Sequence, residues 1–250
     1  METDNKKTIT TTKTDAPDCI GVFDSGVGGL AILESLRREL PGENFVYVFD
    51  RSHSPYGNRS AKYVAARARK ITELLCKKNA KAVVVACNTA TSVGINALRE
   101  KFRIPVIGVE PPVKPAVTTH PNGKIAVLVT PRTAHERRFT SLVERYRTDG
   151  LVVMPCPHLA AAVEENFHDL DKVIPILEKT FETCPEPDAV VLGCTHYYFL
   201  RSQIRKVLGE NAEIFDGADG VAKRTKAVLS ELGLLSDNTC KRGKTSYLYL

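Results

Sequence analysis

The chain contains the stretch VVVACNT at residues 83–89 and a close variant of it, VVLGCTH, at residues 190–196. In each stretch a short apolar run ends at a cysteine that polar residues follow. Such a run predicts a buried strand, with the cysteine at the carboxyl end of that strand. The two cysteines, Cys87 and Cys194, are 107 positions apart.

Three further pairs of apolar runs repeat at nearly the same distance, with offsets of 105 to 107 residues. The matched runs are 20–24 with 125–129, 45–50 with 151–156, and 106–107 with 213–214. Four strands in one order predict two related halves, although any two α/β segments resemble each other to some degree. The halves meet near residues 112–122, where Pro111, Pro112 and Pro115 indicate a linker or hinge.

Stretches with helical spacing separate the apolar runs. Leu30, Leu33, Leu36 and Leu40, for example, predict one face of a helix over residues 30–40. Alternating strands and helices, with strands apolar on both faces, are typical of parallel sheets covered by helices. The expected strands cover residues 19–24, 45–50, 82–87, 105–109, 124–130, 151–155, 188–193, 212–215 and 247–250.

The composition excludes several classes of protein. Of 250 residues, 43% are hydrophobic and 26% charged, which is typical of a globular chain rather than a disordered, collagenous or coiled-coil one. No apolar run approaches the roughly 18 residues of a membrane helix. The net charge of +6 arises from scattered basic residues, so a nucleic-acid partner is not expected. The positive charge favours a small anionic substrate.

The cysteines indicate a reducing compartment. There are seven, an odd number, without a Cys-x-x-Cys pair or a preceding signal peptide, so we expect free thiols in the cytoplasm. A metal site needs three or four ligands at recognisable spacing. Cys194 and His196 supply two, so no metal is expected.

Ligands of parallel sheets bind beyond the carboxyl ends of the strands. The first strand ends in DSGVGG (24–29), which is either a small-anion pocket before a helix or a plain turn. The loop PYG (55–57) offers backbone groups and a phenol, or is a simple turn.

The two strand-end cysteines have two interpretations. A thiol before a helix N-terminus is favoured as thiolate, whereas most free cysteines are structural and buried. If the halves face each other, Cys87 and Cys194 approach one ligand from opposite sides. Two acid–base groups on opposite faces of one carbon suit racemisation. No lysine in a pyridoxal context is evident, so the reaction would need no cofactor.

Five motifs together resemble the signature set of the glutamate racemases, within the aspartate/glutamate racemase superfamily. They are DSGVGG (24–29), PYG (55–57), ACNTA (86–90), GVEP (108–111) and LGCTHY (192–197). The resemblance implies cofactor-free interconversion of L- and D-glutamate, which supplies D-glutamate for peptidoglycan. The repeat and the resemblance together predict two pseudo-symmetric, flavodoxin-like α/β domains with the active site in the cleft between them. The expected domains are residues 19–113 with 221–250, and residues 114–220, after a disordered leader over 1–18.

The resemblance also implies roles for individual residues. Cys87 and Cys194 would exchange the proton, with Asp24 assisting Cys87 and His196 assisting Cys194. Glu164 is a candidate second acid, although a solvated helix glutamate has the same sequence pattern. The implied substrate-binding residues are Asp24, Ser25, Pro55, Tyr56, Gly57, Asn88, Thr89, Thr130, Thr195 and His196, and Thr133 is a further candidate for the pocket lining.

The chain departs from the family at Tyr198, where a proline is typical, and at its end, where members commonly continue into another helix. The long leader is similar to that of members activated by a cell-wall precursor, and a homodimer is one option for the assembly. Two other functions stay open: an aspartate or other amino-acid racemase of the same superfamily, and a non-catalytic module that binds a small anion.

Overall fold

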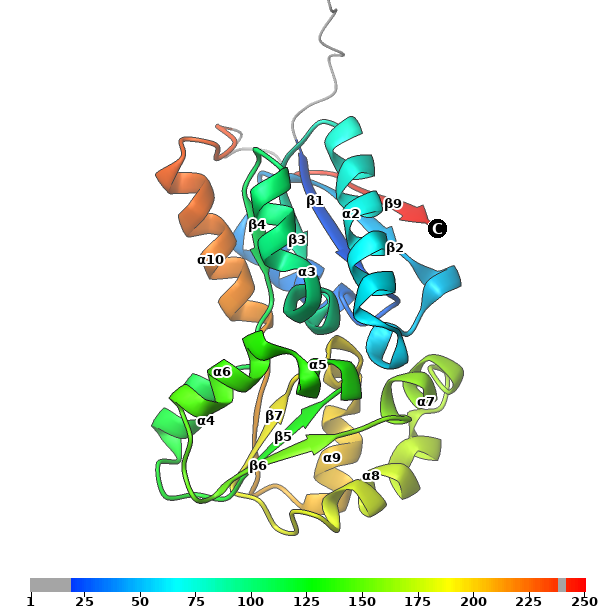
Figure 1. The fold of residues 1–250 in the computed structure, drawn as a ribbon, viewed down its shortest axis with the longest axis vertical. Helices are drawn as coiled ribbons and strands as arrows, with labels where there is room; N and C mark the ends of the chain where they lie inside the picture. The colour runs from blue at the N-terminus through cyan, green and yellow to red at the C-terminus, as the bar shows by residue number, and fades with distance from the viewer. Residues whose placement is uncertain (1–18, 238–241) are drawn as a thin grey trace, which may run out of the picture.

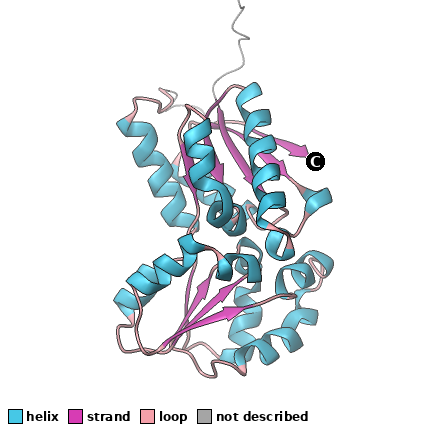
Figure 2. Ribbon diagram, viewed as in Figure 1, coloured by secondary structure: helices cyan, strands magenta, loops and turns pink. Residues whose placement is uncertain are grey.

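The computed structural model describes residues 19–237 and 242–250. The predicted leader over residues 1–18 therefore lies outside the described residues. The described chain forms two parallel sheets, one above the other in Figure 1, and helices cover both faces of each. Figure 2 shows the same two α/β halves coloured by secondary structure.

The first sheet has five parallel strands in the order β4-β3-β1-β2-β9. The strands are β1 (Cys19–Asp24), β2 (Asn44–Phe49), β3 (Ala80–Val85), β4 (Val106–Gly108) and β9 (Thr245–Tyr249). One face packs on α1 (Leu30–Glu39) and α10 (Ala218–Glu231), and the other on α2 (Ala61–Lys77) and α3 (Asn88–Lys101). The predicted C-terminal strand is confirmed as β9 at the sheet edge.

The second sheet has four parallel strands in the order β6-β5-β7-β8. These are β5 (Ile125–Val129), β6 (Leu151–Pro155), β7 (Ala189–Leu192) and β8 (Glu213–Phe215). One face packs on α7 (Leu159–Glu165), α8 (Ile174–Phe181) and α9 (Arg201–Leu208), and the other on α4 (Val113–Thr119) and α6 (Arg137–Arg145). The remaining elements are α5 (Pro131–His135) and the 3-10 turns η1 (Arg51–His53), η2 (Tyr56–Asn58), η3 (Leu170–Val173) and η4 (Thr195–Leu200).

The two sheets repeat one topology. The order β4-β3-β1-β2 of the first sheet corresponds strand by strand to β8-β7-β5-β6 of the second. These are the pairs that the sequence repeat predicts, and the shared order is the one found in flavodoxin-like sheets. The predicted fold class, two parallel-sheet α/β halves, is confirmed. Because β3 and β7 are equivalent, the residues that follow them are equivalent too.

The prediction of a linker at residues 112–122 is wrong over most of its length, because α4 occupies residues 113–119. Val113 and Ala116 are buried against the second sheet. Pro112 immediately precedes this helix and Pro115 lies in its first turn, where a missing N–H leaves no hydrogen bond unmade. The prolines therefore begin a helix instead of marking an extended linker.

The chain passes between the sheets at two neighbouring places, from β4 to α4 and from β8 to α10. Gly217 lies against the first crossing so closely that a Cβ there would be 2.9 Å from Val109 Cγ2 and 3.1 Å from Glu110 O. The two crossings form the joint between the halves. Within the described residues, no helix combines the length and the apolar character that a bilayer span requires.

Candidate active site

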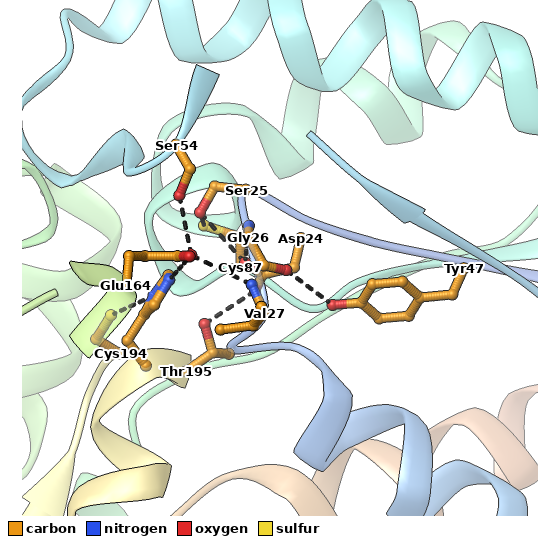
Figure 3. A network of polar contacts seen from close by, with 11 residues as sticks. Asp24, Ser25, Gly26, Val27, Tyr47, Ser54, Cys87, Glu164, Cys194 and Thr195 are labelled. Atoms are coloured by element: carbon orange, nitrogen blue, oxygen red, sulfur yellow. Dashed lines mark hydrogen bonds and ion pairs between the residues drawn. The ribbon is translucent and has the colours of Figure 1, made fainter. Parts of the chain in front are cut away.

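The glycine loop after β1 lies directly against the segment that follows Cys194. A Cβ on Gly28 would be 2.5 Å from Thr195 Oγ1 and 2.7 Å from His196 N, so only glycine fits there without displacement. The first and second halves therefore meet where β1 and β7 end, and Figure 3 shows Asp24 and Cys87 close to Thr195 and Cys194.

Asp24 is fully buried at the end of β1. Its carboxylate accepts hydrogen bonds from Thr195 Oγ1 at 2.8 Å, from the Gly26 N–H at 2.9 Å and from Ser25 Oγ at 3.2 Å. Burial raises the pKa of Asp24, and the charge of His196 and these donors offset only part of that rise. Asp24 thus joins the halves through Thr195 and reaches Cys87 only through Ser25.

Cys87 is the residue immediately before α3 and is buried. Its Sγ lies 3.9 Å from Ser25 Oγ, within hydrogen-bond range for sulfur. Burial raises the pKa of Cys87, and the negative charge of Asp24 raises it further, while the N–H of Ala90 and the Ser25 hydroxyl lower it. The helix start lowers the pKa of Cys87 as expected, but burial outweighs it and the net shift is upward.

Cys194 lies at the start of η4, and His196 lies beside it. His196 Nδ1 is 3.7 Å from Cys194 Sγ, and Nε2 donates to Glu164 Oε1 at 2.7 Å. Burial alone lowers the pKa of His196, but the hydrogen bonds to Cys194 and Glu164 outweigh it, and the pKa lies well above its usual value. His196 and Glu164 thus form a close pair next to the thiol, and this pairing favours the charged form of the imidazole.

Glu164, the candidate second acid, lies in the site and not on a solvated helix face. Besides His196, its Oε1 accepts from the Val27 N–H and from Ser54 Oγ, both at 3.2 Å (Figure 3). Burial raises the pKa of Glu164. The hydrogen bonds from these donors and the charge of His196 lower it by a larger amount, so the net shift is downward. One carboxylate from the second half thus holds two loops of the first.

Three threonines join the halves on another side of the site. Thr89 Oγ1 lies 3.0 Å from Thr130 Oγ1 and 3.4 Å from Thr133 Oγ1. Thr130 also accepts from the Thr133 N–H and begins α5. Gly57 packs on Thr130, since a Cβ there would lie 2.9 Å from Thr130 Cβ. Pro55 directly precedes this turn.

The hydroxyl of Tyr56 donates a hydrogen bond to Asp50. Asp50 is fully buried and also accepts from Arg67 Nε at 2.9 Å. The sequence motifs predict neither Asp50 nor Arg67 as a site residue. Asp50 follows β2 as Asp24 ends β1, so the rule that selected Asp24 would have found it.

Asn88 is 3% exposed, and its Nδ2 has no hydrogen-bond partner among the residues described. Together with Cys194 and Thr195 it lines a small cavity of about 20 Å³. A buried donor without an acceptor suits a negatively charged ligand group. Within residues 19–237 and 242–250, no three His, Cys, Asp or Glu side chains are grouped as a metal site requires.

Two thiols thus follow equivalent strands of a repeated fold and flank a buried polar site. A match to the family model Asp/Glu/Hydantoin racemase covers residues 20–225. The chain belongs to this racemase family. Racemases are isomerases, so the chain is an enzyme of that class.

Sequence relatives and solved structures agree with the family. A glutamate racemase of Clostridium acetobutylicum is 42% identical over 221 residues, which cover 87% of this chain and 86% of the relative. The structure of glutamate racemase isoform RacE1 from Bacillus anthracis is 34% identical, with a TM-score of 0.81 over 93% of this chain and 88% of that one. An Escherichia coli glutamate racemase was solved with L-glutamate and the activator UDP-MurNAc-Ala. It is 28% identical to this chain, with a TM-score of 0.80 over 93% of this chain and 99% of that one.

Proposed function

We propose that this racemase interconverts L- and D-glutamate without a cofactor, with Cys87 and Cys194 as the two proton-transfer groups. The observation that carries the proposal is the equivalence of the two thiols, which follow β3 and β7 of the repeated sheets and approach the same buried site. The relatives named glutamate racemase support glutamate as the substrate.

The reaction needs one thiolate and one thiol. The thiolate removes the proton from Cα and becomes a thiol, and the electron pair of the C–H bond delocalises into the α-carboxylate. The thiol on the other face then gives its proton to Cα and becomes the thiolate. The product has the inverted configuration and carries the proton of the second thiol, while the proton taken from Cα stays on the first sulfur; thiol and thiolate have therefore exchanged places. The reverse reaction uses the same groups in the opposite order.

Neighbouring side chains support each thiol differently. Ser25 lies within hydrogen-bond range of Cys87 and also donates to Asp24, so Asp24 assists Cys87 through Ser25. His196 is directly placed to exchange a proton with Cys194, and Glu164 keeps the imidazole charged.

The substrate site uses the polar groups between the thiols. The Nδ2 of Asn88 and the N–H groups at the start of α3 would stabilise the negative charge that develops on the α-carboxylate. Ser25, Thr89, Thr130, Thr195 and His196 are the further proposed substrate-binding residues, with Ser25 and Thr195 acting through backbone groups or hydroxyl oxygens while their hydroxyl hydrogens are donated to Asp24. Because the Tyr56 hydroxyl is bound to Asp50, the segment Pro55–Gly57 contributes its backbone and its contact with Thr130.

We further infer that the halves act as domains, with residues 19–113 and 221–250 in one and residues 114–220 in the other. Entry of glutamate would then require opening at the joint, and closure would exclude water from the thiolate. The product D-glutamate would serve peptidoglycan synthesis in the cytoplasm, where thiols stay reduced.

A cell-wall precursor is the proposed activator, because the Escherichia coli relative was solved with one. An open cavity of about 950 Å³ at the joint would suit the diphosphate of such a molecule. Its walls carry Arg99, Arg103, Arg138, Arg145 and Arg224. Assays with and without UDP-MurNAc-Ala test this part alone.

Proton NMR of L-glutamate with the protein in D2O, followed by chiral analysis, tests the proposed function. We expect loss of the Cα proton signal together with appearance of D-glutamate, without added cofactor. Exchange of aspartate but not glutamate would instead identify an aspartate racemase. No exchange of either substrate, with reductant and UDP-MurNAc-Ala present, would favour the non-catalytic binding module.

A further inference from the structure

Three side chains near the joint, Tyr198, Arg201 and Asp216, form a cluster that we name the joint clasp. Arg201 begins α9, and its guanidinium carbon lies 5.1 Å from the centre of the Tyr198 ring. The same guanidinium forms an ion pair with Asp216, whose other oxygen accepts the Ala218 N–H at 2.9 Å. The clasp therefore links the end of η4, the start of α9 and the start of α10.

The clasp crosses from one half to the other. Tyr198 belongs to η4 of the second half, but it packs against the hydrophobic core of the first sheet. Asp216 lies between β8 of the second sheet and α10, which covers the first. A proline at position 198, which the family pattern favours, could make neither the ring packing nor the contact with Arg201.

The clasp also lies next to one of the two thiols. Cys194 precedes η4 and Tyr198 lies within it, so a single short turn connects them. The cavity of about 20 Å³ beside Cys194 has Tyr198, Asp216 and Gly217 among its other walls. Asn88, the residue after Cys87, faces the clasp across this cavity, whereas Cys194 is joined to the clasp through the chain of η4. A shift of the clasp would consequently displace Cys194 more than Cys87.

We propose that Tyr198, Arg201 and Asp216 are positioning residues that hold the Cys194–His196 segment against the first half, so that Cys194 reaches Cα. This inference rests on the proposed two-thiol function. Loss of the clasp would slow proton transfer at Cys194 and leave proton transfer at Cys87 intrinsically unchanged.

The primary deuterium isotope effects on kcat/KM for L- and D-glutamate test the proposal. Because the enantiomers have equal free energy, kcat/KM is the same in both directions for every variant, and a rate alone cannot locate the fault. Slower transfer at Cys194 raises the isotope effect for the enantiomer that Cys194 deprotonates and lowers it for the other. Cys194→Ser, measured in parallel, identifies which enantiomer that is.

The test variant is Arg201→Met, and the matched control is Arg205→Met. Arg205 lies one turn further along α9 and, within the described part of the chain, forms an ion pair only with exposed Glu210, at 3.3 Å. We expect kcat/KM to fall about tenfold in Arg201→Met, equivalent to ~1.4 kcal/mol, with the two isotope effects moving apart as in Cys194→Ser. Arg205→Met should retain the wild-type pair of isotope effects. Asp216→Asn is the second test variant, to be used if Arg201→Met folds poorly. It keeps an oxygen that accepts the Ala218 N–H but removes the negative charge that pairs with Arg201.

Unchanged isotope effects in folded Arg201→Met and Asp216→Asn would overturn the proposal, even if total activity fell, because a smaller active fraction alters no isotope effect. An equal change in Arg205→Met would overturn it as well. Failure of the wild-type protein to racemise glutamate would instead refute the proposed function, so the two failures are distinguishable.

Discussion

Thr195 Oγ1 donates a hydrogen bond to Asp24 Oδ2 across 2.8 Å, which ties the residue after one candidate thiol to the carboxylate that ends β1 of the other half. Both residues are buried. The bond gives a fully buried carboxylate one of its three donors, so it serves both the stability of the joint and the geometry of the site.

Thr195→Val should destabilise the protein by about 1–3 kcal/mol, because it leaves a buried carboxylate with a donor missing. Thermal or denaturant unfolding measures this change. Thr140→Val is the control, since the Thr140 hydroxyl is exposed and donates to the Arg137 carbonyl of its own helix. Equal stability of Thr195→Val and the wild type would contradict this account of the Asp24 site.

Ser25→Ala should move the rising limb of the kcat/KM profile to higher pH. The Ser25 hydroxyl lowers the pKa of Cys87, which burial otherwise raises, so its removal makes the thiolate harder to form. We expect the rate at neutral pH to fall about tenfold, which corresponds to the loss of roughly one hydrogen bond. A uniform loss of rate with an unshifted profile would show that Ser25 does not act on this thiol.

Glu164→Gln should lower Tm most in mildly acidic solution. The pKa of Glu164 is lowered from 4.5, so its stabilising effect is present above that pH and disappears as pH falls through the lowered pKa. The pKa of His196 is raised above 6.5, so its stabilising effect is complete below 6.5 and is lost as pH rises through the raised pKa.

The difference in Tm between wild type and Glu164→Gln is thus expected to be largest between pH 4.5 and 6.5, at about 2–4 °C for roughly 1 kcal/mol. Calorimetry across pH measures it. A difference that stayed constant from pH 3 to pH 10 would exclude the ion pair as its cause.

Arg67→Met should be more damaging than any of these changes, because it leaves the fully buried Asp50 without its guanidinium. Breaking a buried pair from one side costs about 3–5 kcal/mol. The control is Arg69→Met on the same helix, whose contact with Glu73 is exposed and 4.0 Å long. If both variants unfold at the same denaturant concentration, Asp50 does not depend on Arg67.

The fold could be predicted from the sequence because the repeat and the strand runs are local signals. Cys87 and Cys194 follow equivalent strands, and their separation of 107 residues matches the offsets of the other repeated strands, so the sequence alone predicted that they occupy equivalent positions. The position of Glu164 was not visible, because its burial depends on contacts with Val27 and Ser54, more than one hundred residues away. The orientation of the Tyr56 side chain likewise depends on its hydrogen bond to Asp50, which the sequence does not reveal. The spacing of the prolines alone did not distinguish helix α4 from a linker.

The most direct test of the two-thiol account is deuterium exchange by single-thiol variants. Cys87→Ala and Cys194→Ala each keep one base on one face of Cα, so each can remove and return a proton only on that face. In D2O we expect each variant to exchange the α-proton of one enantiomer, a different one for each variant, without racemisation. Exchange of the same enantiomer by both, or racemisation by either at the wild-type rate, would contradict the account.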